Sequence, residues 1–438
     1  MKRPGLLLLL LLFVPAAYVL GLLLRSTSTE LSWEQPVRVL GTSTPVAVRA
    51  VNPHGVRDFT AILRQGGKQY IVFQRSEPAK RWAWLRRSEM PRSYQFEAGS
   101  RLAPGVTDGK AELVVEAVSN DFLARRSQLV QAVEIQTKPP SLLVDDMQVV
   151  VTQGGTGAVA FSVSGYWTEA GVRLGPHEFR SFQNPTAKDA SRRITLFAVP
   201  HDLGAGEKPI VFARNPTGAQ VLAPVPHQLI RKRFRSREFN LSSSFLNKVV
   251  SELDPRGTGD LLQRFRRINQ EMRQANNRTL YELRSKTADR PLFQGPFLPL
   301  AKSAPQAQFC DYRKYKYQGQ VIDEQVHLGF DLASTQQAEV PAGNHGQVIF
   351  AGWLGIYGNA IVLDHGLGVQ SLYAHLSQIQ VKVGDLVNRG QIIGRSGSSG
   401  LAGGDHLHFG VQVDGVAVNP LEWWDPAWLE KRILSRYR

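Results

Sequence analysis

Hydrophobic and polar residues follow three different patterns along the chain. Near the N-terminus, residues 6–24 form an uninterrupted run of 19 residues without a charged side chain. Over much of the remainder, short stretches of partly alternating apolar and polar residues, rich in β-branched side chains, predict β-strands. Between about residues 241 and 272, the apolar residues recur at helical spacing instead. The patterns therefore predict a mainly β protein with an N-terminal apolar helix and one helical segment.

Turn-forming residues and changes of pattern divide the chain into parts. The strand patterns at 44–51 and 110–119 predict an immunoglobulin-like sandwich, and those at 147–155 and 193–200 predict a second β domain that could be another small sandwich. The predicted parts are an apolar anchor (1–25), an immunoglobulin-like β domain (26–140), a second β domain (141–224), a basic helical linker (225–291), a glycine-rich β domain (292–426) and a basic C-terminal tail (427–438).

The helical segment follows the basic run at 231–237, which fits either a charged strand or a contact to an anionic wall or lipid. Asn240 or Ser242 can cap a first helix, which Pro255 ends, and Asp260 can cap a second. Two interpretations remain open for these helices. They pack on a neighbouring domain, or they bind a membrane surface or a regulatory partner.

The net charge and the N-terminal apolar run indicate which partners the protein binds and where in the cell it lies. The 52 Lys and Arg residues exceed the 37 Asp and Glu residues by 15, which favours anionic partners such as nucleic acid, acidic lipid or a cell-wall polymer. The apolar run would span about 28 Å as a helix, close to the thickness of a bilayer core. Lys2 and Arg3 would stay in the cytoplasm, so the chain from Arg25 onward would be exported.

We therefore expect a single-pass protein of the cell inner membrane, with the bulk of the chain in the periplasm. Export argues against nucleic acid as a partner. The alternative is a cleaved signal peptide, although its apolar region usually has only 7–15 residues. The single cysteine, Cys310, allows no intrachain disulfide and does not decide the compartment.

Histidines gather in the glycine-rich segment, which holds six of the ten. In a strand over residues 405–413, His406 and His408 would share one face, and the same argument places Tyr373 and His375 on one face. A further pair, His327 and Asp331, precedes them. Zinc accepts imidazole nitrogen and carboxylate oxygen, and catalytic zinc sites have three protein ligands and a water. The combination predicts a metal site.

The motifs HLGFDLAS (327–334), LYAHLS (372–377) and HLHFGV (406–411), together with GNAIVLDHG and GDLVNRGQIIGRSGSSG between them, resemble the lysostaphin/LytM-type zinc endopeptidases. These are β-rich enzymes that cut peptide cross-links or stem peptides of peptidoglycan. The resemblance covers about 130 residues and implies a zinc endopeptidase domain at 292–426. It also implies peptidoglycan as the substrate, with other proteins of the wall machinery as possible partners.

The resemblance implies roles for five residues. His327, Asp331 and His408 would bind one zinc ion per chain, and His375 and His406 would be the catalytic histidines. Which histidine acts as base and which as acid stays open. The alternative function is a non-catalytic scaffold or activator of other wall hydrolases. Tyr373 and Asn359 are weaker candidates for positioning substrate, and His365 is expected to be structural.

The resemblance also implies that upstream residues of the chain could inhibit the catalytic site. Upstream residues of such enzymes often block the groove. The candidate here is the stretch from Leu261 to Lys302 together with the second β domain. In this stretch Asn276, Asn277 or Glu282 could reach a metal. An inert spacer is the alternative.

Overall fold

The computed structural model describes residues 4–80, 82 and 88–437, with the side chains of the first helix described from Phe13 on. That helix, α1 (Pro4–Arg25), coincides with the apolar run. Within the described part of the chain, no helix combines the length and the apolar character that crossing a membrane requires. Residues 1–12 of the expected anchor lie outside the described side chains, so the anchor stays a prediction.

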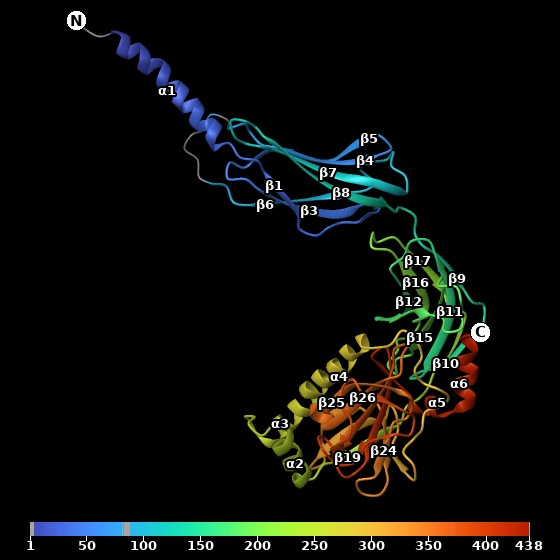
Figure 1. The fold of residues 1–438 in the computed structure, drawn as a ribbon. Helices are drawn as coiled ribbons and strands as arrows, with labels where there is room; N and C mark the ends of the chain where they lie inside the picture. Colours follow the sequence, from blue (N-terminus) through green and yellow to red (C-terminus); the bar gives the residue numbers. More distant parts are fainter. Residues whose placement is uncertain (1–3, 81, 83–87, 438) are drawn as a thin grey trace. The chain divides into compact units, whose positions relative to one another are not determined.

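One compact unit contains residues 1–140 together with residues 165–168 and 214–220. Its strands form a three-stranded sheet, β1-β3-β6, and a five-stranded sheet, β2-β8-β7-β4-β5 (Figure 1). Buried residues of both sheets share one hydrophobic core, in which the ring of Phe59 stacks on that of Tyr94. The strands are β1 (Glu30–Trp33), β2 (Val39–Leu40), β3 (Thr44–Val51), β4 (Val56–Gln65), β5 (Lys68–Ser76), β6 (Arg92–Ala98), β7 (Gly109–Ser119) and β8 (Arg126–Ile135).

The second unit contains residues 141–164, 169–213 and 221–438. Its first part has two four-stranded sheets, β14-β15-β11-β9 and β13-β12-β16-β17, and a parallel pair, β10-β18. The strands are β9 (Ser141–Val144), β10 (Val149–Thr152), β11 (Thr156–Ser164), β12 (Glu169–Leu174), β13 (His177–Arg180), β14 (Phe182–Gln183), β15 (Arg192–Ala198), β16 (Ile210–Arg214), β17 (Gln220–Pro224) and β18 (His227–Ile230).

The helical segment begins and ends at the residues that the sequence predicts. Ser242 caps α2 (Ser243–Leu253) by accepting the backbone N–H of Phe245. Asp260 caps α3 (Leu261–Arg267) in a capping box with Gln263. A wider turn, η1 (Ile268–Met272), leads from α3 into α4 (Arg273–Glu282), which ends in η2 (Leu283–Ser285).

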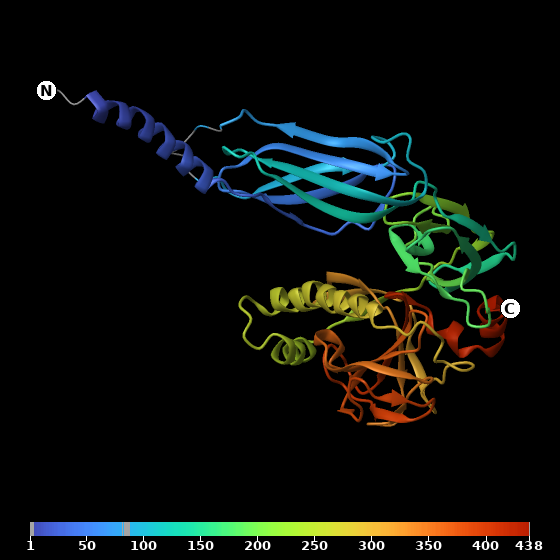
Figure 2. The same cartoon turned by 45° about the horizontal axis from the view of Figure 1, so that its top comes forward.

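These helices pack on the sheet that follows them. Leu246, Val249 and Phe265 are buried in one core with Ile356 and Leu372 of the C-terminal part of the chain. Both ribbon views place α4 beside β25 (Figures 1 and 2). The interpretation that the helices pack on a neighbouring domain is therefore confirmed. The remaining domain boundaries stay a prediction.

The C-terminal part is built on an eight-stranded sheet with the order β20-β23-β31-β27-β26-β25-β29, to which β32 adds by pairing with β31. Two smaller sheets, β19-β21-β22 and β24-β30-β28, flank it. The strands are β19 (Ser236–Asn240), β20 (Ala304–Ala307), β21 (Tyr312–Tyr317), β22 (Gln320–Val326), β23 (Phe330–Ala333), β24 (Glu339–Pro341), β25 (Gly346–Trp353), β26 (Asn359–Asp364), β27 (Val369–Leu376), β28 (Gln378–Ile379), β29 (Leu386–Val387), β30 (Ile392–Arg395), β31 (Leu407–Val413) and β32 (Val416–Val418).

The chain closes with two short helices, α5 (Pro420–Trp424) and α6 (Pro426–Arg432). Glu422 of α5 accepts the backbone N–H of Thr156 at 2.8 Å, and Trp423 Nε1 donates to the Thr156 hydroxyl at 3.3 Å. These bonds tie the C-terminal helices to β11 within the second unit.

Candidate metal centre

Two neighbouring strands and the loop before one of them bring together His327, Asp331 and His408. Asp331 on β23 is the register partner of His408 on β31, and His327 lies between β22 and β23. His327 Nε2, Asp331 Oδ1 and His408 Nδ1 lie 2.9 Å from one another. All three residues are buried. The structure thus gathers the three ligands implied by the sequence resemblance at one point.

Hydrogen bonds alone do not satisfy this triangle of atoms. His327 Nδ1 lies 2.9 Å from the carbonyl oxygen of Gln308, so this nitrogen carries the ring proton and donates it. If the ring carries no second proton, Nε2 presents a lone pair to Oδ1 of Asp331, which only accepts. A cation among the three atoms removes this repulsion, and two imidazole nitrogens with one carboxylate oxygen are a donor set that zinc binds. The residues therefore fit a divalent metal.

The protonation states suit metal binding as well. Burial lowers the pKa of His408 to about 4, so its imidazole is neutral near pH 7. Burial raises the pKa of Asp331, but His327 and His408 outweigh it and hold that pKa well below its ordinary value. The second oxygen of Asp331 accepts from Arg313 Nη2 of β21 at 2.9 Å. Neutral imidazoles and an ionised carboxylate are the forms that coordinate metals.

The His408 ring is positioned by close packing rather than by a second hydrogen bond. Its Nε2 finds no hydrogen-bond partner among the described residues. Gly329, in the loop before β23, lies directly behind the ring. A Cβ atom on Gly329 would lie 2.4 Å from both Nε2 and Cε1 of His408, which is far inside van der Waals contact.

We expect Gly329→Ala to push His408 out of the triangle and to weaken metal binding by about tenfold or more. Zinc affinity, measured by competition with a chromogenic chelator, checks this. Gly403→Ala is the matched control, because Gly403 also lines the cavity but a Cβ there meets nothing within 4 Å. Unchanged zinc affinity in Gly329→Ala would contradict the packing argument.

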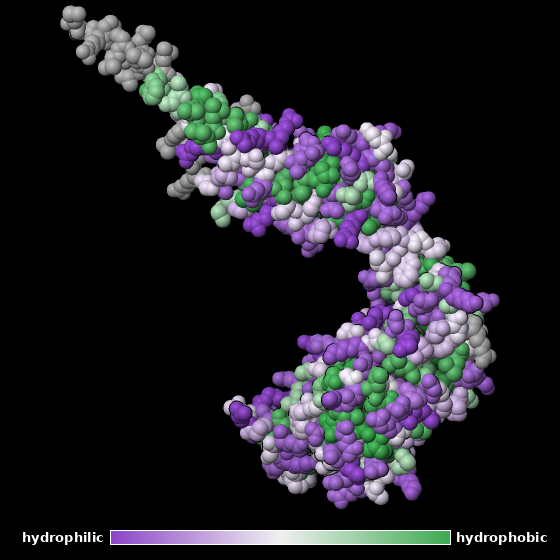
Figure 3. All heavy atoms as spheres, viewed as in Figure 1, coloured by the Kyte–Doolittle hydropathy of each residue, from purple (hydrophilic) through white to green (hydrophobic). Residues whose placement is uncertain are grey.

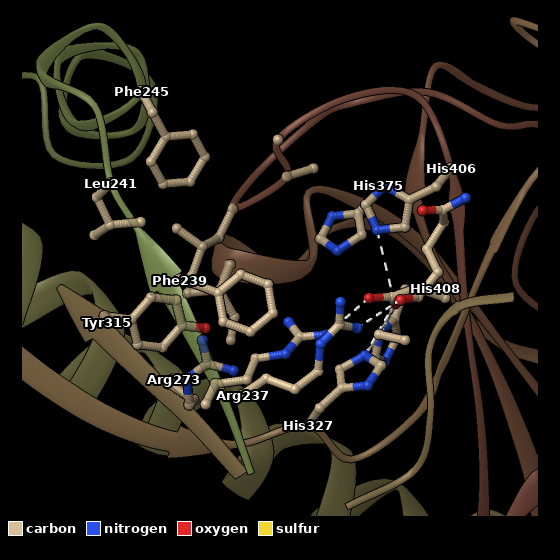
Figure 4. A pocket seen from close by; sticks show the side chains of 18 of the residues that line it. Arg237, Phe239, Leu241, Phe245, Arg273, Tyr315, His327, His375, His406 and His408 are labelled. Carbon is tan, nitrogen blue, oxygen red and sulfur yellow. Dashed lines mark hydrogen bonds and ion pairs between the residues drawn. The ribbon is translucent and has the colours of Figure 1, made fainter. Parts of the chain in front are cut away.

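Two further histidines, His375 and His406, stand next to the triangle (Figure 4). His375 Nδ1 donates to the carbonyl oxygen of Ser399, and His406 Nδ1 donates to that of Gly404, both at 2.8 Å. With this proton on Nδ1, the neutral ring of His375 has its acceptor at Nε2. The ring centres are 4.9 Å apart, and His406 Nε2 lies 3.7 Å from Asp331 Oδ1. Burial, followed by His406 and His408, holds the pKa of His375 well below its ordinary value.

The prediction that Tyr373 and His375 share a face was wrong. Tyr373 pairs with Phe409, and its hydroxyl accepts the backbone N–H of Gly343 at 2.7 Å, on the face away from the triangle. Ala374 pairs with His408 instead. His375 reaches the metal centre because its backbone has a φ of 62°, which breaks the alternation of the strand. A non-glycine residue in this conformation is strained, as is common at functional sites.

Two other residues have structural roles. Asn359 donates its side-chain amide to the carbonyl oxygen of Leu376 at 3.1 Å and does not line the cavity, so its expected contact with substrate finds no support. His365 is buried between the carbonyl oxygen of His345 and the hydroxyl of Ser371, at 2.6 and 2.7 Å. Its expected structural role is confirmed.

A cavity of about 460 Å³ lies beside the histidines, within the size range of ligand sites. Sequence reasoning missed the residues on its far side. Phe239 and Leu241 come from β19 and the turn after it, and Tyr357 comes from the turn before β26, with its ring centre 5.6 Å from that of His408. Figure 4 shows the aromatic and apolar side chains facing the histidines across the cavity.

The two asparagines of the upstream stretch bond residues of the cavity wall, and a blocking role of the stretch stays a prediction. Asn276 accepts the backbone N–H of Ile356 at 2.9 Å, and Asn277 accepts the hydroxyl of Tyr357 at 2.9 Å. Glu282 is not among the residues that line the cavity. Because α3 and α4 share a core with the sheet, the stretch is also more than a spacer. It helps to build the wall of the cavity.

A family model identifies the part of the chain that carries this centre. The model of peptidase family M23 matches residues 325–420, a range that contains all five histidine and aspartate residues of the site. The chain carries a peptidase family M23 domain at its C-terminus. The resemblance to lysostaphin/LytM-type enzymes is thereby confirmed. Arg313 and the wall formed by β19 and α4 lie outside the matched range.

Relatives of the M23 domain include a named peptidase and a named activator. It is 42% identical over 96 residues to the DD-carboxypeptidase/endopeptidase Mpg of Neisseria meningitidis serogroup B, a match that covers 22% of each chain. It is 38% identical over 109 residues to the murein hydrolase activator EnvC of Escherichia coli, covering 25% of this chain and 26% of EnvC. The similarity thus spans about a quarter of these relatives.

Among solved structures, the catalytic domain of lysostaphin from Staphylococcus simulans is 32% identical. The match covers 28% of this chain and 94% of that domain, with a TM-score of 0.25.

Proposed function

We propose that this protein is a zinc endopeptidase that cleaves peptide bonds of peptidoglycan, in its cross-links or stem peptides. The observation that carries the proposal is the complete set of five residues around one cavity. Three converge on a metal position and two more histidines stand beside it. The M23 match and the relative named as an endopeptidase support the same reaction.

The side chains of this chain would share the work of hydrolysis. When bound, zinc supplies Lewis acidity toward the scissile carbonyl and toward water. His327, Asp331 and His408 would hold it, and Arg313 keeps the Asp331 carboxylate oriented through its second oxygen. His375 is neutral and turns an unprotonated Nε2 toward the cavity, so it can accept a proton from water. The Nδ1 atom of His406 likewise bonds a backbone carbonyl oxygen, that of Gly404, and one of the two histidines would return a proton to the leaving amine.

The second candidate is a protein that activates other wall hydrolases, as the name of EnvC states for that relative. Digestion of purified peptidoglycan separates the two functions. For a peptidase, the zinc-loaded chain alone releases new amino termini from peptidoglycan. For an activator, release occurs only after a partner hydrolase is added. Residues 26–438 are suited to the test, because a protein starting at Leu292 would lose the helices that complete its core.

We also propose that the protein is anchored in the inner membrane by residues 6–24 and exposes the remainder to the periplasm. The described end of α1 is strongly apolar and open to solvent, with Phe13 70% and Leu24 78% exposed (Figure 3). Such a surface is costly in water.

We therefore expect the full chain to stay in the membrane fraction through high-salt extraction, while a chain beginning at Ser26 is soluble. Immunoblotting of the fractions measures this. Recovery of a soluble mature form whose first residue lies between 17 and 30 would indicate a cleaved signal peptide instead.

A further inference from the structure

The cavity of the metal centre is lined by an excess of positive charge. Three arginines line it, Arg237, Arg273 and Arg313, whereas Asp331 is the one acidic residue among the lining residues that the structure describes. Asp331 is already paired with Arg313 at 2.9 Å and belongs to the metal triangle. The two remaining guanidinium groups therefore have no carboxylate within the cavity. A bound divalent metal would increase this positive charge further.

Two of the arginines are placed where their charges oppose each other. β19 and β21 pair in parallel, with Arg237 opposite Arg313 and Phe239 opposite Tyr315. Like charges at directly opposed positions destabilise a sheet. The Phe239 ring offsets part of this repulsion, because the guanidinium carbons of Arg237 and Arg313 lie 5.5 and 5.2 Å from its centre. An arrangement that costs stability and faces a cavity points to a ligand of opposite charge.

The third arginine approaches from another element. Arg273, at the start of α4, donates to the backbone carbonyl of Asn269 at 3.1 Å and to its side-chain oxygen, both neutral acceptors. Arg237 donates to the carbonyl oxygen of Gln306 at 2.9 Å and forms a long ion pair with Asp311 at 3.8 Å, whose carboxylate is bonded more closely by Arg235. Figure 4 shows Arg237 and Arg273 beside Phe239 and Tyr315, across from His375 and His406. Among the described residues, their other N–H groups make no hydrogen bond, so these groups can serve a ligand in the cavity.

We infer that Arg237 and Arg273 form a carboxylate-binding subsite, which selects peptides with a free carboxylate close to the bond to be cut. Guanidinium groups bind carboxylates through two parallel hydrogen bonds, which fixes the orientation as well as the position of the ligand. The inference rests on the proposed function, because it describes the substrate of the same cavity.

Both arginines precede residues 325–420, the range matched by the M23 family. The helical segment and β19 therefore contribute specificity to the M23 domain of this chain. They form part of the substrate site.

Binding to the metal-free protein tests the subsite without requiring catalysis. The probes are two peptides, acetyl-Ala-Ala-Glu-Ala-amide and acetyl-Ala-Ala-Gln-Ala-amide, which differ only in one carboxylate. NMR titration of residues 26–438 is expected to give at least about tenfold tighter binding of the glutamate peptide, the effect of one charge-assisted hydrogen bond. Arg237→Gln and Arg273→Gln should each reduce this preference, and the double variant should abolish it.

Arg278→Gln is the matched control, because Arg278 is exposed on the same helix and does not line the cavity. It should keep the full preference for the glutamate peptide. Thermal unfolding of each variant shows whether its fold is intact, and Arg237→Lys serves in place of Arg237→Gln if the latter unfolds, with a smaller preference expected because lysine cannot make the paired bonds.

Equal binding of the two peptides by the unaltered protein would overturn the inference, as would a preference that survives the double variant. Neither outcome would contradict the proposed function. That proposal fails by a separate result, namely that the zinc-loaded chain cleaves no peptidoglycan.

Discussion

Replacing His408 with alanine is expected to remove most of the bound zinc. The metal position has three protein ligands, whose ligand atoms lie 2.9 Å from one another, and zinc binding needs all three. Loss of one imidazole leaves only His327 and Asp331 of the three ligands, one fewer than catalytic zinc sites use. Zinc content after dialysis, measured by atomic emission, should fall from about one ion per chain to a small fraction of that.

His345→Ala is the control for the first variant. His345 lies outside the cavity, and its ring accepts the backbone N–H of Arg389 at 3.4 Å. Zinc content should therefore stay at one per chain. Full zinc retention in His408→Ala, with the fold intact, would show that the metal is held elsewhere.

Replacing His375 is expected to leave zinc bound and to lower peptidoglycan cleavage by about 10²-fold or more, the usual contribution of a general acid or base. Its imidazole stands beside the triangle, with the rings of His375 and His408 centred 5.8 Å apart. Release of new amino termini per bound zinc measures the effect. Equal loss of zinc in His375→Ala and His408→Ala would contradict the separate roles.

The strained backbone of His375 calls for a second variant. Alanine at a φ of 62° destabilises the local fold, whereas asparagine adopts this conformation more readily. His375→Asn should therefore be as inactive as His375→Ala while unfolding at a higher temperature. Activity that returns in His375→Asn would mean that the backbone, and not the imidazole, carries the effect.

The part of the site that follows simple periodicity could be predicted from the sequence. Strand alternation predicts a metal site near His406 and His408, and the resemblance to the lysostaphin/LytM-type enzymes implies the ligands. Asp331 and His408 then lie on regular strands that pair directly. Strand alternation fails for Tyr373, which it wrongly places on the same face as His375. One left-handed residue, His375, reverses the alternation, and nothing in the composition of LYAHLS reveals that backbone angle.

Contacts between segments that lie far apart in the chain could not be predicted from the sequence. The helix caps at Ser242 and Asp260 are local signals and were read correctly. The pairing of β19 with β21 joins residues about 75 positions apart, and no local pattern selects that partner or its register. The arginine wall of the cavity depends on this pairing. The helical pattern between 225 and 291 likewise indicates helices that pack on a neighbouring domain, but not which residues of the sheet share their core.

The account rests on one zinc ion held by three residues, and anomalous diffraction at the zinc absorption edge tests it most directly. Crystals of the zinc-loaded protein should show a single peak about 2.0–2.2 Å from His327 Nε2, Asp331 Oδ1 and His408 Nδ1, with His375 and His406 on its open side. A zinc-loaded protein with no peak among these three atoms, or with its peak held by other residues, would contradict the account.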